Sequence, residues 1–270
     1  MKLARLAVSI ASMALLPAAL AQTPPGGGIL GTAHDFASTV AGANLIPNVV
    51  PGGVGLCTYC HTPHRAYATL LLWNHTLSSN TFSWDVPKTT AGTNFPAIPG
   101  GTYKGPTTKC LSCHDGSVAV GDIAWYKEQA WSGAGAASTF KMGGIAGNGD
   151  DTSHFLIGVG GAMKGNHPVA MPYSYNQAAN TYNAITGGTM LVLTEWQPDP
   201  TTLASAHIRL FNDDGAGNIS AGPVAGKTGI ECSSCHDPHN KAAIDNWFLR
   251  GNAQGSTQAD GYICLQCHIK

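Results

Sequence analysis

Four copies of one five-residue pattern carry the chemistry of this chain. The pattern is Cys-x-x-Cys-His, and it uses all eight cysteines. It is the attachment signature of c-type haem: the two thiols form thioether bonds to the porphyrin, and the histidine binds the iron from one side. We therefore predict four covalent haem c groups, at motifs one to four in chain order. The attachment cysteines are Cys57 and Cys60, Cys110 and Cys113, Cys232 and Cys235, and Cys264 and Cys267, and the proximal iron ligands are His61, His114, His236 and His268.

Paired cysteines also build zinc sites and disulfide frameworks. Two Cys-x-x-Cys pairs can make an all-thiolate zinc site, but zinc does not explain the histidine that follows every second cysteine. Disulfides at this spacing would close very small loops, in a chain far longer than the mini-proteins that depend on them. Both alternatives explain fewer of these residues than haem does.

Histidines are numerous enough to complete every iron site. Eleven are present, so seven remain after the four proximal ligands. An iron held by two imidazoles has no open position for a substrate, which favours electron transfer over catalysis. The predicted distal ligands are His34, His64, His167 and His239, with His75 and His154 in reserve. His207 is a rival, because it stands 25 residues before motif three much as His34 stands 23 before motif one.

Two of these histidines cannot bind the haem of their own motif. His64 and His239 each lie three residues beyond a proximal histidine. Three residues cannot carry the chain around the porphyrin to its opposite face, so each must serve a different haem. Asn166 beside His167 and Asp35 beside His34 are candidate hydrogen-bond partners for those two rings.

The composition predicts a chain without an ordinary core. Charged residues make up 11% of it, and glycine is abundant at 34 residues, whereas an average soluble domain is about 25% charged. We expect a mostly irregular fold with few short helices and strands, wrapped around a stacked core of four haems. Apolar runs predict strands at 189–195 and 207–211, and a turn at 213–215 predicts a small hairpin.

The first 21 residues have the form of a secretory signal. Lys2 and Arg5 precede an apolar run too short to span a bilayer, and Ala19-Leu20-Ala21 suits cleavage. We expect a secreted protein without a membrane span, beginning with a flexible arm at 22–28. Without Lys2 and Arg5 the chain keeps 12 basic and 15 acidic side chains, a net charge of −3. This charge gives no reason to expect nucleic-acid binding.

An internal repeat divides the motifs into two pairs. Motif one (CTYCHTPH) matches motif three (CSSCHDPH), and motif two (CLSCH) matches motif four (CLQCH). The haem pairs therefore span residues 57–114 and 232–268, on either side of a loop-rich middle at 125–225. We predict a single domain over 22–270, because electron transfer requires the two pairs to lie close together.

Several stretches resemble the doubled-CxxCH multihaem cytochromes, and most of all the outer-surface tetrahaem cytochromes that polymerise into extracellular filaments in metal-reducing bacteria. The resemblance covers most of the chain after the signal and is weak from about 130 to 161. The matching stretches are GTAHDF (31–36), CTYCHTPH (57–64), LWN (72–74), CLSCHDGSVAVGDI (110–123), NHPV (166–169), IRLF (208–211), CSSCHDPHN (232–240) and FLR (248–250).

The resemblance implies a continuous stack of bis-histidine haems that alternate between parallel and T-shaped contacts and continue from subunit to subunit. It implies the same four distal ligands, with His64 able to reach into the next subunit. The expected function is to carry electrons from donor cytochromes to extracellular acceptors along a head-to-tail filament of copies of this chain, without enzyme activity. The alternatives are a soluble periplasmic tetrahaem shuttle and, less in keeping with four plain motifs, a multihaem reductase with an open iron position.

Overall fold

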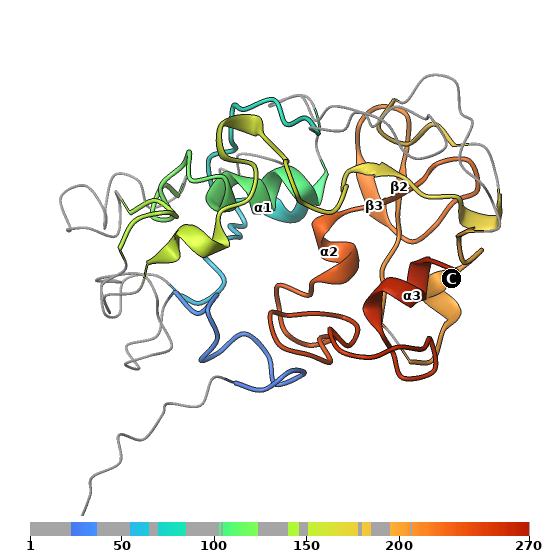
Figure 1. Cartoon of the computed structure of the whole chain (residues 1–270). Coiled ribbons are helices and arrows are strands. Elements are labelled where there is room, and N and C mark those ends of the chain that lie inside the picture. The colour runs from blue at the N-terminus through green and yellow to red at the C-terminus, as the bar shows by residue number, and fades with distance from the viewer. Residues whose placement is uncertain are drawn as a thin grey trace, which may run out of the picture.

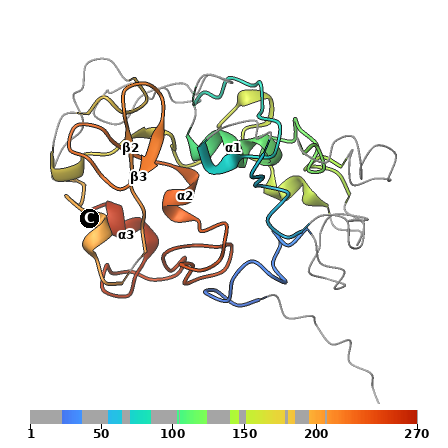
Figure 2. The same ribbon diagram turned by 180° about the vertical axis from the view of Figure 1, so that it is seen from behind.

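The computed structural model is shown from two opposite sides in Figures 1 and 2. It describes residues 23–36, 55–64, 70–84, 103, 105–123, 140–145, 151–177, 180–184, 195–205 and 207–269. The predicted signal at 1–21 and nearly all of the predicted strand 189–195 lie outside these ranges. Within them, no helix is both long and apolar enough to cross a membrane.

Regular secondary structure is sparse in the described part of the chain, which confirms the prediction of a mostly irregular fold. In both views helix α2 lies between α1 and α3 (Figures 1 and 2). The helices are α1 (Pro106–His114), α2 (Cys232–Cys235) and α3 (Ile263–Cys267), with short 3-10 segments η1 (Leu70–Leu72), η3 (Thr152–Phe155), η4 (Val159–Gly161), η5 (Tyr175–Gln177), η6 (Tyr182–Ala184) and η8 (Pro200–Thr202).

Each of the three α-helices in the described part of the chain coincides with a Cys-x-x-Cys-His motif. Motifs two, three and four form α1, α2 and α3, and motif one is a turn closed by the same kind of bond, from His61 N to Cys57 O at 2.8 Å. Residues three and four apart lie on one face of a helical turn. Each motif therefore presents two sulfurs and one imidazole on the same side.

A small antiparallel sheet supports motif three. Its strands are β1 (Met171–Pro172), β2 (Phe211–Asp213), β3 (Ile219–Ala221) and β4 (Thr228–Ile230), in the order β1-β4-β2-β3. The predicted hairpin is confirmed as β2–β3. The predicted strand 207–211 is wrong in its bounds, because His207 N and Arg209 N instead bond the carbonyls of Arg250 and Ser234. Strand β4 leads directly into α2.

The side-chain core is small and lies between this sheet and α1. Outside it, large apolar side chains close to the motifs stay well exposed, among them Trp247 at 65% and Leu71 at 54%. The core residues are Phe82, Trp84, Tyr103, Leu111, Met163, Ala170, Tyr182, Phe211 and Ile219, with a second cluster of Met171, Tyr173, Leu210 and Ile230.

The N-terminal arm differs from the prediction. Gly28 N bonds Asn240 O at 3.0 Å, and the Asn240 amide returns bonds to the carbonyls of Pro24 and Gly28. The flexible start expected at 22–28 is therefore anchored, over 24–28, to the loop that follows motif three (Figure 1). This anchor brings His34 to the motif-two side of that loop.

Candidate haem-binding sites

Three of the four predicted proximal histidines face a second imidazole. In each case the facing ring belongs to a predicted distal histidine, and it comes from a distant part of the chain. The ring centroids lie 6.1 Å apart for His61 and His239, 6.3 Å apart for His114 and His34, and 6.3 Å apart for His268 and His167.

This spacing has a simple chemical meaning. A metal lies about 2 Å from a bound imidazole nitrogen, which lies about 1.2 Å from its ring centre, so two imidazoles that held one metal from opposite sides would have centroids about 6.4 Å apart. Neighbouring aromatic rings in proteins also have centroids about 4.5–7 Å apart. The support for haem is that each pair joins a motif histidine to a predicted distal histidine, so that these residues would hold the iron of a haem between them.

In five of the eight predicted ligands, the second ring nitrogen bonds a backbone carbonyl. A carbonyl oxygen only accepts, so Nδ1 beside it carries the proton and Nε2 is left to bind a metal, as is usual for metal-bound histidine. The partners predicted beside two of the rings are wrong, because the Asn166 amide bonds Lys164 O and Asp35 bonds Gly31 N. The distances from Nδ1 to the carbonyl are 2.6 Å for His61 and Leu71, 3.1 Å for His114 and Phe155, 2.8 Å for His236 and Trp247, 3.4 Å for His34 and Pro238, and 2.9 Å for His167 and Pro168.

Burial favours the neutral forms of His34, Cys60 and Cys235. It lowers the pKa of His34 to about 4, with a further contribution from His114, and a neutral imidazole is the form that binds a metal. Burial also raises the pKa of the Cys60 thiol to about 12 and that of Cys235 to about 11. A buried neutral sulfur suits a thioether, whereas a zinc site requires thiolates.

Haem iron needs no protein ligands beyond a pair of histidines of this kind. In the described residues, no three or more His, Cys, Asp or Glu side chains converge on one metal position. Haem iron needs only two protein ligands, because the porphyrin supplies the rest. Among the described residues, four buried side-chain donors have no hydrogen-bond partner, and haem propionates are acceptors of the right chemistry for such groups: Trp73 Nε1, Thr76 Oγ1, Ser174 Oγ and Ser233 Oγ.

The cysteines of neighbouring motifs lie close to one another. Cys60 of motif one lies near enough to Cys113 of motif two for a charge on Cys113 to raise its pKa. Cys110 of motif two is close enough to Cys232 of motif three to raise its pKa, and Cys264 of motif four likewise raises the pKa of Cys235. The four motifs therefore follow one another in space in the order of the sequence.

A buried carboxylate holds the junction of motifs two and three. Glu231 accepts hydrogen bonds from the hydroxyls of Tyr103 and Tyr182 and from both the backbone and the side chain of Thr107. Thr107 is the second residue of α1, and its hydroxyl accepts the N–H of Cys232, which begins α2. Burial raises the pKa of Glu231. Sequence reasoning missed this residue, although its capping box with Ser234 was a usable signal.

A short segment, the motif-three clamp (Trp247–Arg250), folds back onto motif three. Its carbonyls accept from His236 Nδ1 at 2.8 Å and from Asp237 N at 2.7 Å. Arg250 N bonds Cys235 O at 2.8 Å, and the Arg250 guanidinium bonds Ser233 O at 3.1 Å.

The motif-one clamp (Leu71–Asn74) repeats this arrangement at motif one. Its carbonyls accept from His61 Nδ1 at 2.6 Å and from Thr62 N at 2.8 Å, Asn74 N bonds Cys60 O at 2.9 Å, and the Asn74 amide bonds Thr58 O. The first two residues of each clamp have positive φ, between 49° and 64°. Such backbone costs about 1 kcal/mol or more per residue, so the surrounding bonds must hold it. The sequence repeat is therefore a structural repeat.

His236 and His64 are the two predicted ligands left without a facing ring. All eleven histidines are described, and none places its ring opposite that of His236 in the way of the three pairs. His64 is exposed on the loop after motif one.

The three remaining histidines have other contacts. Both nitrogens of His75 lie within 2.9 Å of carbonyl oxygens. The ring of His154 packs on Phe155 at 3.8 Å. His207 Nδ1 lies 3.0 Å from Ala242 O. Of the three, only His207 shares the backbone-bonded Nδ1 and unengaged Nε2 of the predicted ligands.

No family model matches this chain, and no match was found among the curated proteins. The functional argument therefore depends on the residues described above.

Proposed function

We propose that this chain is a tetrahaem c-type cytochrome that forms an extracellular electron-conducting filament and is not an enzyme. One observation carries the proposal: three proximal histidines face an imidazole of the same chain at 6.1–6.3 Å, and one proximal histidine faces none. Bound haem c supplies a one-electron iron couple.

The protein's own groups explain why electron transfer is favoured over catalysis. Imidazoles on both sides of an iron leave no position at which a substrate could bind. Backbone carbonyls hold the rings in place on the proximal side, as at His61 and His114. Thr107 of α1 bonds Glu231 and Cys232 at the start of α2, which brings the two motif pairs together, as a continuous electron path requires.

The unpaired histidines point to a filament. His236 lacks a facing ring, and His64 is exposed and cannot bind the haem of its own motif. If His64 of one subunit completes the site of His236 in the next, each subunit donates one ligand and accepts one. Such a head-to-tail contact propagates as an open filament unless its rotation closes a ring.

One observation favours the alternative of a soluble shuttle. His207 lies beside motif three, because His207 N bonds Arg250 O at 2.9 Å and the Arg250 guanidinium bonds His207 O. If His207 completes the site of His236 within one chain, no filament joint is needed.

The variants His64→Ala and His207→Ala distinguish the filament from the soluble shuttle. For the filament we expect His64→Ala to keep four attached haems by mass, to lose filaments in electron microscopy, and to gain one high-spin ferric haem in the EPR spectrum. His207→Ala should keep filaments and four low-spin haems. If His207→Ala gives the high-spin haem and His64→Ala does not, the shuttle is correct.

A further inference from the structure

The first two residues of the motif-three clamp reach beyond their own site. The ring of Phe248 stacks on the imidazole of His34, with centroids 4.7 Å apart and planes 15° apart. His34 faces His114 of motif two. Phe248 O at the same time accepts the N–H of Asp237, which follows His236. One residue therefore touches the distal ligand of the second site while it supports the proximal ligand of the third.

Trp247 makes the matching connection on the other side. Its carbonyl accepts from His236 Nδ1, and its ring lies 5.8 Å from that of Phe155. Phe155 O accepts from His114 Nδ1 at 3.1 Å. Both imidazoles of the motif-two site are thus contacted, directly or through one residue, from the clamp that holds the proximal imidazole of motif three.

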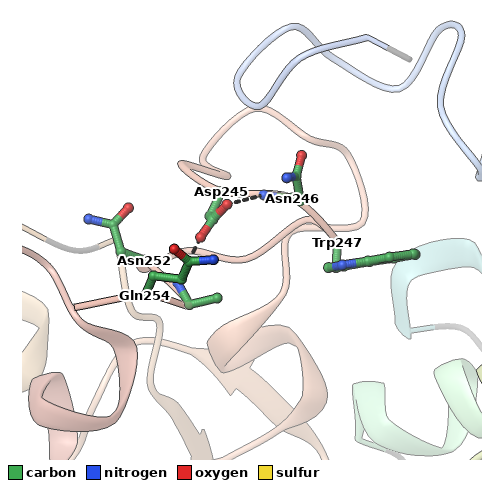
Figure 3. A pocket seen from close by; sticks show the side chains of 6 residues that line it. Asp245, Asn246, Trp247, Asn252 and Gln254 are labelled. Carbon is green, nitrogen blue, oxygen red and sulfur yellow. Dashed lines mark hydrogen bonds between the residues drawn. The ribbon is translucent and has the colours of Figure 1, made fainter. Parts of the chain in front are cut away.

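The backbone around these rings is held tightly. The carboxylate of Asp245 accepts the N–H of Asn246 and of Ala253, each at 2.7 Å, and closes the loop that leads into the clamp. Figure 3 shows the side chain of Trp247 pointing away from this polar group of Asp245, Asn252 and Gln254. The loop therefore directs Trp247 away from its own polar neighbours and toward motif two.

We propose that Trp247 and Phe248 are positioning residues that set the orientation of the His34 and His114 imidazoles relative to the motif-three site. They couple the two haem pairs mechanically, because a shift of one clamp moves ligands at both sites. The motif-one clamp has Leu71 and Leu72 at these places, with the same left-handed backbone. Aromatic rings in the motif-three clamp are thus not needed to form the clamp itself. The proposal rests on haem at motifs two and three, which is part of the proposed function, but not on the filament.

The internal repeat supplies the experiment. The double variant Trp247→Leu with Phe248→Leu gives the motif-three clamp the residues that the motif-one clamp already has, so the clamp should still fold. In the haem-loaded protein, the signal of the second site is the low-spin ferric EPR signal that His34→Ala removes. We expect the double variant to keep four haems by mass and to shift or broaden this one signal, because the imidazole planes, now 66° apart, lose their support.

Two controls make the test specific. Leu71→Ala with Leu72→Ala truncates the equivalent apolar pair and should leave the second-site signal in place. Phe248→Tyr keeps the stacked ring and should retain the wild-type signal. The inference is overturned if the double variant gives a spectrum that superimposes on the wild type, or if all four signals change together. Absence of haem from the wild-type mass would instead refute the proposed function itself.

Discussion

Replacing Arg250 with alanine tests how the third site is held together. The guanidinium of Arg250 lies 3.4 Å from the carboxylate of Asp237, and both side chains are at most 7% exposed. Asp237 directly follows His236, and Arg250 Nε also lies 3.3 Å from His236 O. The pair therefore fixes the backbone on which a predicted iron ligand stands.

The expected cost follows from the burial of the charge that remains. Removing one partner of a buried ion pair costs about 3–5 kcal/mol, because the other charge stays buried and unpaired. Asp237 keeps hydrogen bonds from the N–H groups of Lys241 and Ala242 at 2.8 and 2.6 Å. We therefore expect Arg250→Ala to lower the free energy of unfolding by about 3 kcal/mol at pH 7, at the lower end of that range.

Asn74 provides the matched control. It holds the equivalent place in the motif-one clamp, where its neutral amide bonds Thr58 O. Asn74→Ala removes a neutral hydrogen bond and should cost about 1–2 kcal/mol. Urea unfolding of the haem-loaded proteins, followed by far-ultraviolet circular dichroism, measures both, with an unchanged slope showing that only stability has changed.

The effect of Arg250 should depend on pH. Burial alone would raise the pKa of Asp237, but the N–H of Ala242 and the charge of Arg250 outweigh it, and the pKa falls below its ordinary value of 3.8. A carboxyl whose pKa is lower in the folded than in the unfolded state stabilises the fold at pH values above its unfolded-state pKa. This stabilisation is lost as the pH falls through the folded-state pKa. The difference between wild type and Arg250→Ala should narrow below pH 3.8. This reasoning is refuted if Arg250→Ala and Asn74→Ala lower the free energy of unfolding equally at pH 7. It is also refuted if the difference in stability between wild type and Arg250→Ala stays the same in acid.

Two further predictions address the cofactor. The intact mass of the purified protein should exceed that of the polypeptide from Gln22 by four haem masses, because eight cysteines form four attachment motifs; a smaller excess, bound zinc or a disulfide contradicts this. His34→Ala should leave four attached haems but turn one ferric haem high-spin and open to carbon monoxide, because the imidazole facing His114 is removed. His154→Ala is the control and should keep every haem low-spin, and a low-spin His34→Ala spectrum would mean that His114 has another partner.

Most of what could be predicted from the sequence came from patterns of residues close together in the chain. Each Cys-x-x-Cys-His motif is a single helical turn, so its geometry depends on residues within five positions of one another. The scarcity of regular structure followed from composition in the same way. The strand expected at 207–211 failed because its first residues bond Arg250 and Ser234, which lie far along the chain, and no local pattern reports such partners.

The candidate site shows the same division. The predicted number of haems and the pool of possible ligands came from the spacing of cysteines and histidines. Glu231 and the two clamps were missed, because their importance comes from burial and from bonds between distant segments. Leu71 and Trp247 look like ordinary apolar residues until the structure places their carbonyls against imidazole nitrogens.

By itself the sequence determined where haem can be attached, since thioether chemistry needs only two thiols and a histidine on one turn. It could also exclude His239 from the haem of its own motif, because three residues cannot span a porphyrin. Only the tertiary structure decided that His239 faces His61, that His34 faces His114, and that His236 faces no imidazole of its own chain. The facing histidines lie up to 178 positions apart in the sequence, and loop closure over such lengths is decided by the packing of the whole chain.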